Sequence, residues 1–352
     1  MNDASKRFLM ELLETNSPSG YEEPAARRWR AEADEFADEV TVDSLGNSFA
    51  RLRGDGPKVV FAGHMDEIGL QVSYVDDQGY LWFQGIGGWD DQVLTGQHVR
   101  VITDNGVVSG VVGRRPAHLL SADERGKASR IKDLWIDIGA LDSSEAKSLV
   151  QPGDAVVIDR PVTELQGGII AGRGLDNRVG SFVALEALRR LADDRPVADV
   201  YALGAVQEEI GFRGAQTAAF GLDPDVAIVL DVCHATDHPN ADKHSGGDVK
   251  VNAGPALARG SVVHPGVHQM LADAAREAGI GYSIDLVPRS SGTDADAVAP
   301  SRAGIPCGIV SFPCRYMHSP SELVSLSDLD QSAELLAQFA RRVGSELDLR
   351  RV

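Results

Sequence analysis

ALGAVQEEIGFRGA, residues 202–215, is the segment from which the fold class can be predicted. Residues 201–206 form a mostly apolar run, which is typical of a strand buried on both faces of an α/β sheet. Two adjacent glutamates, Glu208 and Glu209, follow the run, and a glycine comes shortly after them. Because neighbouring side chains on a strand point to opposite faces, we expect the two carboxylates to be aimed at different targets.

Helical and strand patterns alternate along most of the chain. Helices are expected at residues 6–14, 22–36, 177–191, 215–220, 266–278 and 326–343, and strands at residues 40–43, 47–52, 58–63, 199–206, 226–230 and 305–310. Alternating strands and helices predict an α/β sheet with helices on both of its faces.

Residues 69–163 have a different character. Apolar and polar residues alternate there, and turn signals such as Asp104-Asn105-Gly106 separate the runs. This pattern is typical of short antiparallel strands joined by tight turns. We therefore predict one α/β domain, residues 1–68 and 164–352, interrupted by a β-rich insertion, residues 69–163.

Composition excludes several classes of function. The 352-residue chain carries a formal net charge of -18, which argues against nucleic-acid binding through a broad basic surface. No apolar run reaches the length that spans a membrane, and the amphipathic N-terminus does not resemble a signal peptide. Cys233, Cys307 and Cys314 form no zinc or disulfide framework. These features together predict a cytoplasmic protein without nucleic-acid or membrane partners.

Ionisable side chains follow five of the apolar segments. They are His64 with Asp66, then Asp176, the pair Glu208 and Glu209, Asp231, and His318. A lone aspartate before a helix is usually an N-cap, and Asp176 could serve as one. As a set, however, histidines and carboxylates delivered to one side of one sheet are the ligands of zinc and related divalent ions. Two histidines and three carboxylates exceed the needs of one ion, and they suit two ions that share a carboxylate.

The two adjacent glutamates can then have different roles. One of them can coordinate a metal ion, while the other stays unligated and acts as general base on a metal-activated water. Asp66 lies two residues after His64, so its side chain can point the same way. It can accept the second ring N–H of that histidine and orient the ring.

Six blocks in order along residues 17–324 resemble the signature segments of the tetrahedral (TET) aminopeptidases. The blocks are AGHMDEIG, GLDNRVG, VQEEIGFRGA, LDVCHATD, SGTDADA and RYMHSPSE. The family comprises glutamyl, leucyl and deblocking aminopeptidases, some of them labelled endoglucanases. The resemblance implies a phosphorylase/hydrolase-like α/β catalytic domain, a PDZ-like β insertion and a dinuclear zinc or cobalt site.

The resemblance also implies roles for single residues. Matching the blocks assigns His64, Asp176, Glu209, Asp231 and His318 as metal ligands with Asp176 bridging, Glu208 as general base, and Asp66 as the residue that orients His64. Thr293 and Asp294 are expected to shape the site without a chemical role. The extra histidines, His234, His238 and His244, are expected to lie in a surface loop beside the site rather than to bind a further ion.

The leading functional hypothesis is a metal-dependent aminopeptidase that removes N-terminal residues from peptides. A glycoside hydrolase with paired glutamates is one alternative. Its two carboxyls would face each other across the substrate, roughly 5–10 Å apart, whereas adjacent strand residues face apart. A non-catalytic assembly subunit is another alternative, although buried carboxylates without metal would be costly. The sequence leaves open the preferred N-terminal residue and the choice among zinc, cobalt and manganese.

The insertion also carries an expectation about assembly. Its segment GVVGRRPAHLLSADERGKASRIKDLWIDIGA, residues 110–140, is similar to the family segment that joins subunits. The resemblance implies dimers built through this insertion, which assemble further into a hollow homododecamer. Such a shell would admit short or unfolded peptides and exclude folded proteins.

Overall fold

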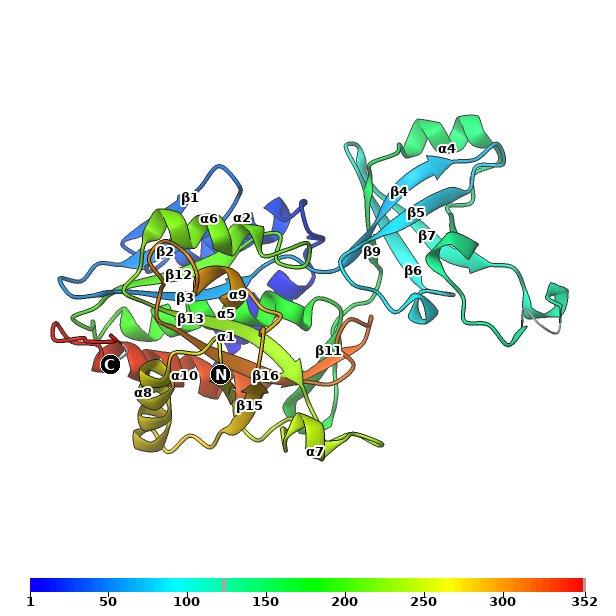
Figure 1. Ribbon diagram of the computed structural model, residues 1–352. Helices are drawn as coiled ribbons and strands as arrows, with labels where there is room; N and C mark the ends of the chain where they lie inside the picture. The colour runs from blue at the N-terminus through cyan, green and yellow to red at the C-terminus, as the bar shows by residue number, and fades with distance from the viewer. Residues whose placement is uncertain (122–124, 351–352) are drawn as a thin grey trace.

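An eight-stranded mixed sheet forms the centre of the protein in the computed structural model, which describes residues 1–121 and 125–350 (Figure 1). Its strands, in spatial order, are β1 (Glu39–Val42), β2 (Ser48–Leu52), β12 (Asp199–Ala205), β3 (Lys58–His64), β13 (Val226–His234), β16 (Cys307–Cys314), β14 (Ala256–Gly260) and β15 (Ser283–Val287). The four central strands, β12, β3, β13 and β16, are mutually parallel. Their carboxyl ends therefore meet at one edge, where ligands of open α/β sheets collect.

Helices cover both faces of this sheet, as the alternating pattern predicts. One face carries α1 (Asp3–Leu13), α2 (Glu23–Ala33), α5 (Leu175–Leu191), α8 (Pro265–Glu277) and α10 (Leu326–Arg342), and the other carries α6 (Arg213–Leu222) and α9 (Ala295–Val298). This arrangement confirms a mixed α/β fold.

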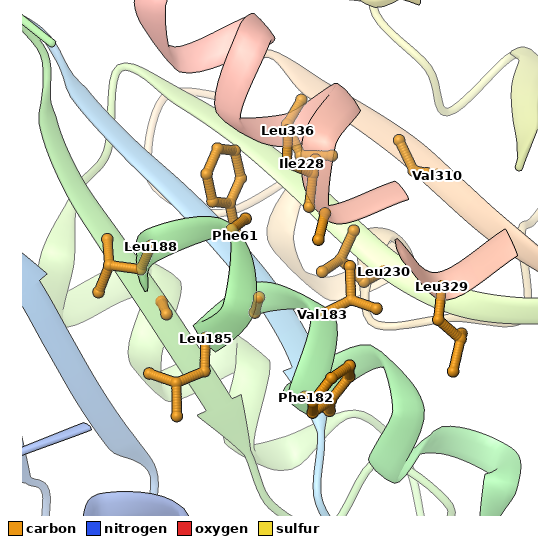
Figure 2. Close-up of a cluster of buried hydrophobic side chains, with 14 of the residues drawn as sticks. Phe61, Phe182, Val183, Leu185, Leu188, Ile228, Leu230, Val310, Leu329 and Leu336 are labelled. Carbon is orange, nitrogen blue, oxygen red and sulfur yellow. The ribbon is translucent and has the colours of Figure 1, made fainter. Parts of the chain in front are cut away.

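The larger core lies between the sheet and helices α5 and α10 (Figure 2). This cluster includes Phe61 of β3, Ile228 of β13, Phe182 and Leu185 of α5, and Leu336 of α10. Each of these side chains is fully buried. Burial of a large apolar side chain stabilises the fold by roughly 1.5–3 kcal/mol, so this layer holds α5 firmly on the sheet.

Gly63 allows α5 to lie unusually close to β3. A Cβ atom on Gly63 would lie 2.4 Å from the carbonyl carbon of Gly180, so a larger residue at position 63 would force the helix away. Since His64 follows Gly63 directly, this close approach places the start of α5 beside the end of β3.

Residues 69–158 supply a closed barrel that projects away from the sheet in Figure 1. Its strands, in order around the barrel, are β4 (Gly69–Val75), β5 (Leu81–Ile86), β8 (Leu134–Asp137), β7 (Gly106–Arg114), β6 (His98–Thr103) and β9 (Ala155–Ile158), and α4 (Ser143–Leu149) lies in the chain between β8 and β9. Leu70, Val72, Val101, Ile136 and Val156 belong to its own buried apolar core. The antiparallel pairing agrees with the alternating pattern of the sequence, and the more specific PDZ-like topology stays a prediction.

A small antiparallel sheet lies beside the central one. It contains β10 (Thr163–Glu164), β11 (Ile169–Gly172) and β17 (Glu322–Ser325), and the short helix α7 (Lys243–Gly246) follows β13 in the chain. The expectation that all five ligand-bearing segments belong to one sheet is therefore wrong for Asp176. The strand before it, β11, pairs with β17 instead. The two strands are antiparallel, with Ile169 opposite Ser325 and Gly172 opposite Glu322.

Two strand boundaries also differ from the expected ones. The strand expected at residues 226–230 continues to His234, so Asp231 lies inside β13 rather than after it. The strand expected at residues 199–206 ends at Ala205, before the two glutamates. In residues 1–121 and 125–350, no helix combines the length and apolar character needed to cross a bilayer.

Candidate metal centre

The sequence-predicted histidines and carboxylates come together at the carboxyl edge of the central strands. The set comprises His64 at the end of β3, Asp231 within β13, Glu208 and Glu209 after β12, Asp176 in the first turn of α5, and His318 after β16. Except for His318, whose side chain is 37% exposed, these side chains are buried. Because these residues come from four different strands and a helix, the site forms only when the α/β domain is folded.

Asp176 lies between the two histidines. One of its oxygens, Oδ1, is 3.3 Å from Nε2 of His64, and the other, Oδ2, is 3.4 Å from Nε2 of His318. Asp231 Oδ1 lies 3.9 Å from the same nitrogen of His64, and Glu209 Oε2 lies 3.4 Å from the same nitrogen of His318. Among the described residues the geometry contains three possible metal-binding groups. Two of them, His64–Asp176–Asp231 and Asp176–Glu209–His318, share Asp176, and the third is His64–Glu208–Glu209.

Glu208 and Glu209 converge on this site, so the expectation that their carboxylates diverge is wrong. The chain leaves β12 at Ala205, and Gln207 takes a left-handed conformation with φ of 57°. This turn breaks the alternation of a strand, and one oxygen of each glutamate comes within 4.8 Å of a ring nitrogen of His64. Glu208 Oε2 lies 3.7 Å from His64 Nε2.

Asp66 links His64 to the two glutamates. Its Oδ1 lies 3.3 Å from Nδ1 of His64, on the opposite side of the ring from Asp176. The same carboxylate accepts hydrogen bonds from the backbone N–H groups of Glu208 and Glu209, each at 3.1 Å, and from the Ser19 hydroxyl at 2.6 Å. Nδ1 of His64 also lies 3.2 Å from the backbone carbonyl oxygen of Asp66. Asp66 therefore orients the ring through both its carbonyl and its fully buried carboxylate, and the carboxylate also positions the glutamate pair.

Glu322 is a supporting residue that the sequence reasoning missed. Its Oε2 accepts the backbone N–H of Asp176 at 3.0 Å, and its Oε1 accepts the backbone N–H of His318 at 3.1 Å. The side chain is buried at the start of β17. The signal was present, because Glu322 closes the block RYMHSPSE four residues after His318.

Asp176 does not cap helix α5, which removes the N-cap alternative for this residue. The side chain of Asn177 performs that role: its Oδ1 accepts the backbone N–H of Gly180 at 3.0 Å. Its Nδ2 donates to the carbonyl of Leu230 at 2.6 Å and ties the start of the helix to β13. The carboxylate of Asp176 is left to face the histidines.

Electrostatics in the site reflect an excess of buried carboxylates. Burial raises the pKa of Glu208 to about 10, although the nearby His64 opposes the shift. Burial likewise raises the pKa of Asp231 well above its usual range. Hydrogen bonding to Asp176 and Glu209 raises the pKa of His318 to about 11. Closely spaced acids with raised pKa values are the environment in which a divalent cation relieves mutual repulsion.

Two acidic groups lack the partners that a buried carboxylate normally has. Oε1 of Glu209 and both oxygens of Asp294 accept no hydrogen bond from the described residues. Asp294 is only 1% exposed, and burial raises its pKa to about 7. The donor set around His64 and His318, with an unpartnered Glu209 oxygen, fits divalent metal ions.

The site opens into a cleft of about 620 Å³. Asp176, Glu208, Glu209, Asp231 and His318 all line it, as does Thr293. His234, His238 and His244 are all exposed, and His234 also lines the cleft. His234 is the last residue of β13, so the expectation that it lies in a surface loop is wrong for this histidine. In the part of the chain that the structure describes, the possible metal-binding groups include none of these three histidines.

Several known proteins are similar to this chain in sequence and structure. The family model described as M42 glutamyl aminopeptidase matches residues 46–335. The lysyl aminopeptidase of Pyrococcus furiosus is 35% identical over 93% of this chain and 94% of its own length. A TET aminopeptidase from a marine sediment archaeon of the Thaumarchaeota superimposes with a TM-score of 0.93 at 36% identity, covering 97% of each chain. The TET1 peptidase of Pyrococcus horikoshii gives a TM-score of 0.86 at 32% identity, over 96% of this chain and 99% of that one.

These matches extend over both the α/β domain and the barrel, and the family match includes every ionisable side chain of the site from His64 to His318. The sequence resemblance to the TET aminopeptidases is thereby confirmed. The chain belongs to the M42 glutamyl aminopeptidase family.

Proposed function

We propose that the protein is a dinuclear metallo-aminopeptidase that hydrolyses N-terminal residues from peptides. Membership of the M42 family supports aminopeptidase activity. The observation that carries the dinuclear assignment is the position of Asp176, which presents one oxygen to His64 and the other to His318. A carboxylate between two ligand groups is the arrangement that two ions with a shared ligand require.

The chain's own residues divide into two metal-binding groups around that bridge. His64 and Asp231 would hold one ion, Glu209 and His318 the other, and Asp176 both. The mixture of imidazole and carboxylate donors suits Zn²⁺, with Co²⁺ a second choice. When bound, such ions polarise the scissile carbonyl and lower the pKa of an attacking water.

Glu208 is the proposed general base. It lies beside His64 but belongs to neither group that contains Asp176. In the reaction it takes a proton from the attacking water and delivers it to the leaving amine. Asp66 keeps His64 in the tautomer that leaves Nε2 free to bind, because it occupies the Nδ1 side of the ring.

One argument against the glycoside hydrolase alternative no longer holds, and a different argument takes its place. Since Glu208 and Glu209 converge on one cleft, divergence of their side chains can no longer exclude it. Membership of a peptidase family now argues against it instead. A non-catalytic subunit is also disfavoured, because the ligand set is complete and the acidic site would be costly to keep without a function.

The proposal extends to assembly and location. The Pyrococcus horikoshii relative can assemble into a tetrahedron or a large octahedral shell. We infer that this chain also forms a homo-oligomer, a dodecamer built from dimers, with residues 69–163 as the dimerisation domain and residues 1–68 and 164–352 as the catalytic domain. Closed symmetric assemblies are common among soluble proteins. Enclosure in the cytoplasm would restrict the substrates to peptides.

A panel of aminoacyl chromogenic substrates, with metal content measured on the same sample, tests the function. We expect turnover that a chelator abolishes and that added Zn²⁺ or Co²⁺ restores. Cellulose-type substrates should give no product. Chelator-insensitive glycoside cleavage would favour the glycosidase, and metal-loaded protein inactive on every aminoacyl substrate would contradict the proposal.

A further inference from the structure

The cleft contains one carboxylate that lies outside the candidate metal centre, Asp285 on the edge strand β15. It belongs to none of the possible metal-binding groups. Its Oδ2 accepts a hydrogen bond from the Ser311 hydroxyl at 3.1 Å. Among the described residues, no lysine or arginine nitrogen lies within ion-pair distance of it, so the charge of Asp285 has no strong cationic partner in the chain.

Strand register explains how an edge-strand residue reaches the cleft. Asp231 of β13 pairs with Ser311 of β16, Ser311 pairs with Ala256 of β14, and Asp285 pairs with Ala258 of the same strand. Cross-strand partners point to the same face of a sheet. The two alanines between Ser311 and Asp285 are small and buried, which leaves room for the aspartate to lean over β14 toward Ser311 and the metal centre.

Carboxylates dominate the charge of the cleft. Five carboxylates line it, those of Asp176, Glu208, Glu209, Asp231 and Asp285, and no lysine or arginine of the described chain does. The first four belong to the machinery proposed above. Asp285 remains as an additional negative charge, half-buried and open to the same space. A substrate with an acidic N-terminal side chain would meet no lysine or arginine of the described chain here, whereas a basic one would meet the carboxylate of Asp285.

The lining beside Asp285 also suits a long aliphatic stem. Val287 and Ile309 are buried apolar residues of the wall, and Met317 and Phe212 add further apolar surface. Lysine and arginine bury their methylene stems along such surfaces while their charged ends reach a polar partner. The cleft thus offers apolar walls with a carboxylate among them.

We propose that Asp285 makes this enzyme select peptides with a cationic N-terminal side chain, lysine or arginine, over acidic and neutral ones. This inference rests on the proposed aminopeptidase function and adds the substrate class. A charge-assisted hydrogen bond between an ammonium or guanidinium group and Asp285, with Ser311 holding the other carboxylate oxygen, would supply the discrimination.

His234 is the group of the chain that would compete with the substrate for Asp285. It lines the same cleft, and in its protonated form it favours the ionised form of the aspartate. Burial raises the pKa of Asp285, so its usual value underestimates the pH at which it ionises. Replacing His234 with glutamine should leave the preference for cationic residues in place, because the hydrogen bond to Ser311 holds the carboxylate independently of the histidine.

The test compares lysyl- and norleucyl-p-nitroanilide, which share a straight side chain but differ in the terminal ammonium group. We expect the metal-loaded, full-length protein to have a higher kcat/KM for the lysyl substrate than for the norleucyl or glutamyl one. In Asp285→Asn the ratio of lysyl to norleucyl kcat/KM should fall roughly ten- to a hundredfold. The control Asp273→Asn, an aspartate with 28% exposed side chain on α8, should keep the wild-type ratio.

A binding measurement separates this inference from the proposed function. Calorimetric titration of the metal-loaded protein with free lysine and free norleucine measures the affinity of the cleft for each amino acid without any turnover. Lysine should bind more tightly than norleucine to the wild type but not to Asp285→Asn. Hydrolysis of norleucyl or glutamyl substrates at least as efficiently as lysyl ones would overturn the inference and leave the aminopeptidase assignment standing. A lysine preference that persists in Asp285→Asn would overturn it as well. Failure to hydrolyse any aminoacyl substrate, with lysine still bound through Asp285, would instead refute the aminopeptidase assignment.

Discussion

Asp66 Oδ1 lies 3.3 Å from Nδ1 of His64, and the same carboxylate accepts the backbone N–H groups of Glu208 and Glu209. The residue therefore joins the end of β3 to the turn after β12. The proposed ligand and the proposed base come from different strands, and this carboxylate fixes their relative position. Its burial is complete, and the Ser19 hydroxyl occupies a further acceptor site.

Asp66→Asn should lower both metal affinity and turnover, each by about ten- to a hundredfold. An amide has one acceptor oxygen and cannot serve His64 and both backbone N–H groups together. Metal titration and kcat measured on the same preparation check this. Ser19→Ala removes only one donor to Asp66 and should have a smaller effect, and equal losses in the two variants would contradict the assigned role.

Glu208→Gln should keep both metal ions and lose turnover on the order of a hundredfold or more. Glutamine has nearly the same shape but cannot take a proton from water. Metal analysis alongside kcat distinguishes a base from a ligand. Glu209→Gln is the matched control and should lose metal. If Glu208→Gln loses metal and Glu209→Gln keeps it, Glu208 is the ligand and Glu209 the base.

Asp176→Asn should reduce metal occupancy at both positions. The two carboxylate oxygens face different histidines, and an amide supplies an oxygen to only one of them. Elemental analysis after dialysis against limiting Zn²⁺ gives the stoichiometry. Asp231→Asn should reduce occupancy at one position only. Retention of one full equivalent in Asp176→Asn would make Asp176 a terminal ligand rather than a bridge.

Much of the site could be predicted from the sequence because apolar runs mark buried strands. Runs that end near His64 and Glu208 identified strands whose carboxyl ends meet at one edge, and the pattern of the insertion identified its antiparallel strands. The resemblance of the six blocks then gave each residue a role. The alternation of strand and helix was thus enough to predict the fold class and the sheet edge at which the site lies.

Other features depend on contacts between distant parts of the chain. The pairing of β11 with β17 joins residues at least 150 positions apart, so no local pattern could separate β11 from the central sheet. Glu322 supports Asp176 through that pairing. The convergence of Glu208 and Glu209 depends on a left-handed Gln207, a conformation that glutamine seldom adopts and that its sequence context does not signal.

The particle size in solution tests the assembly proposal. Light scattering on the metal-loaded protein should give a mass about twelve times the 37.5 kDa of the chain. The exposed apolar side chains of the barrel, such as Tyr74 and Leu119, are available for contacts between subunits. A stable dimer would retain the interface but remove the enclosure, and a monomer at micromolar concentration would contradict both.

The last prediction concerns Glu67, which follows Asp66 and has a structural role. Its carboxylate is buried between two arginines, Arg173 and Arg178, and Arg178 Nη1 lies 2.7 Å from Oε1. Arg178 also donates to the carbonyl of Leu13 at 2.9 Å, so the cluster joins the end of α1 to α5. Glu67→Gln leaves both buried arginines without an anion here and should lower the free energy of unfolding by roughly 3–5 kcal/mol.

The sign of the pH dependence follows from the same cluster. The charges of Arg173 and Arg178 lower the pKa of Glu67 below its ordinary 4.5 in spite of burial. The stabilisation is therefore fully present above pH 4.5 and is lost as the pH falls through the lower pKa of the folded protein. Denaturant unfolding of metal-free protein should show the difference between wild type and Glu67→Gln shrinking as the pH is lowered below that value. Glu23→Gln, which breaks the surface pairs of Glu23 with Arg27 and Arg30 on α2, should cost at most about 1 kcal/mol per pair. A similarly small cost for Glu67→Gln at neutral pH would contradict the prediction.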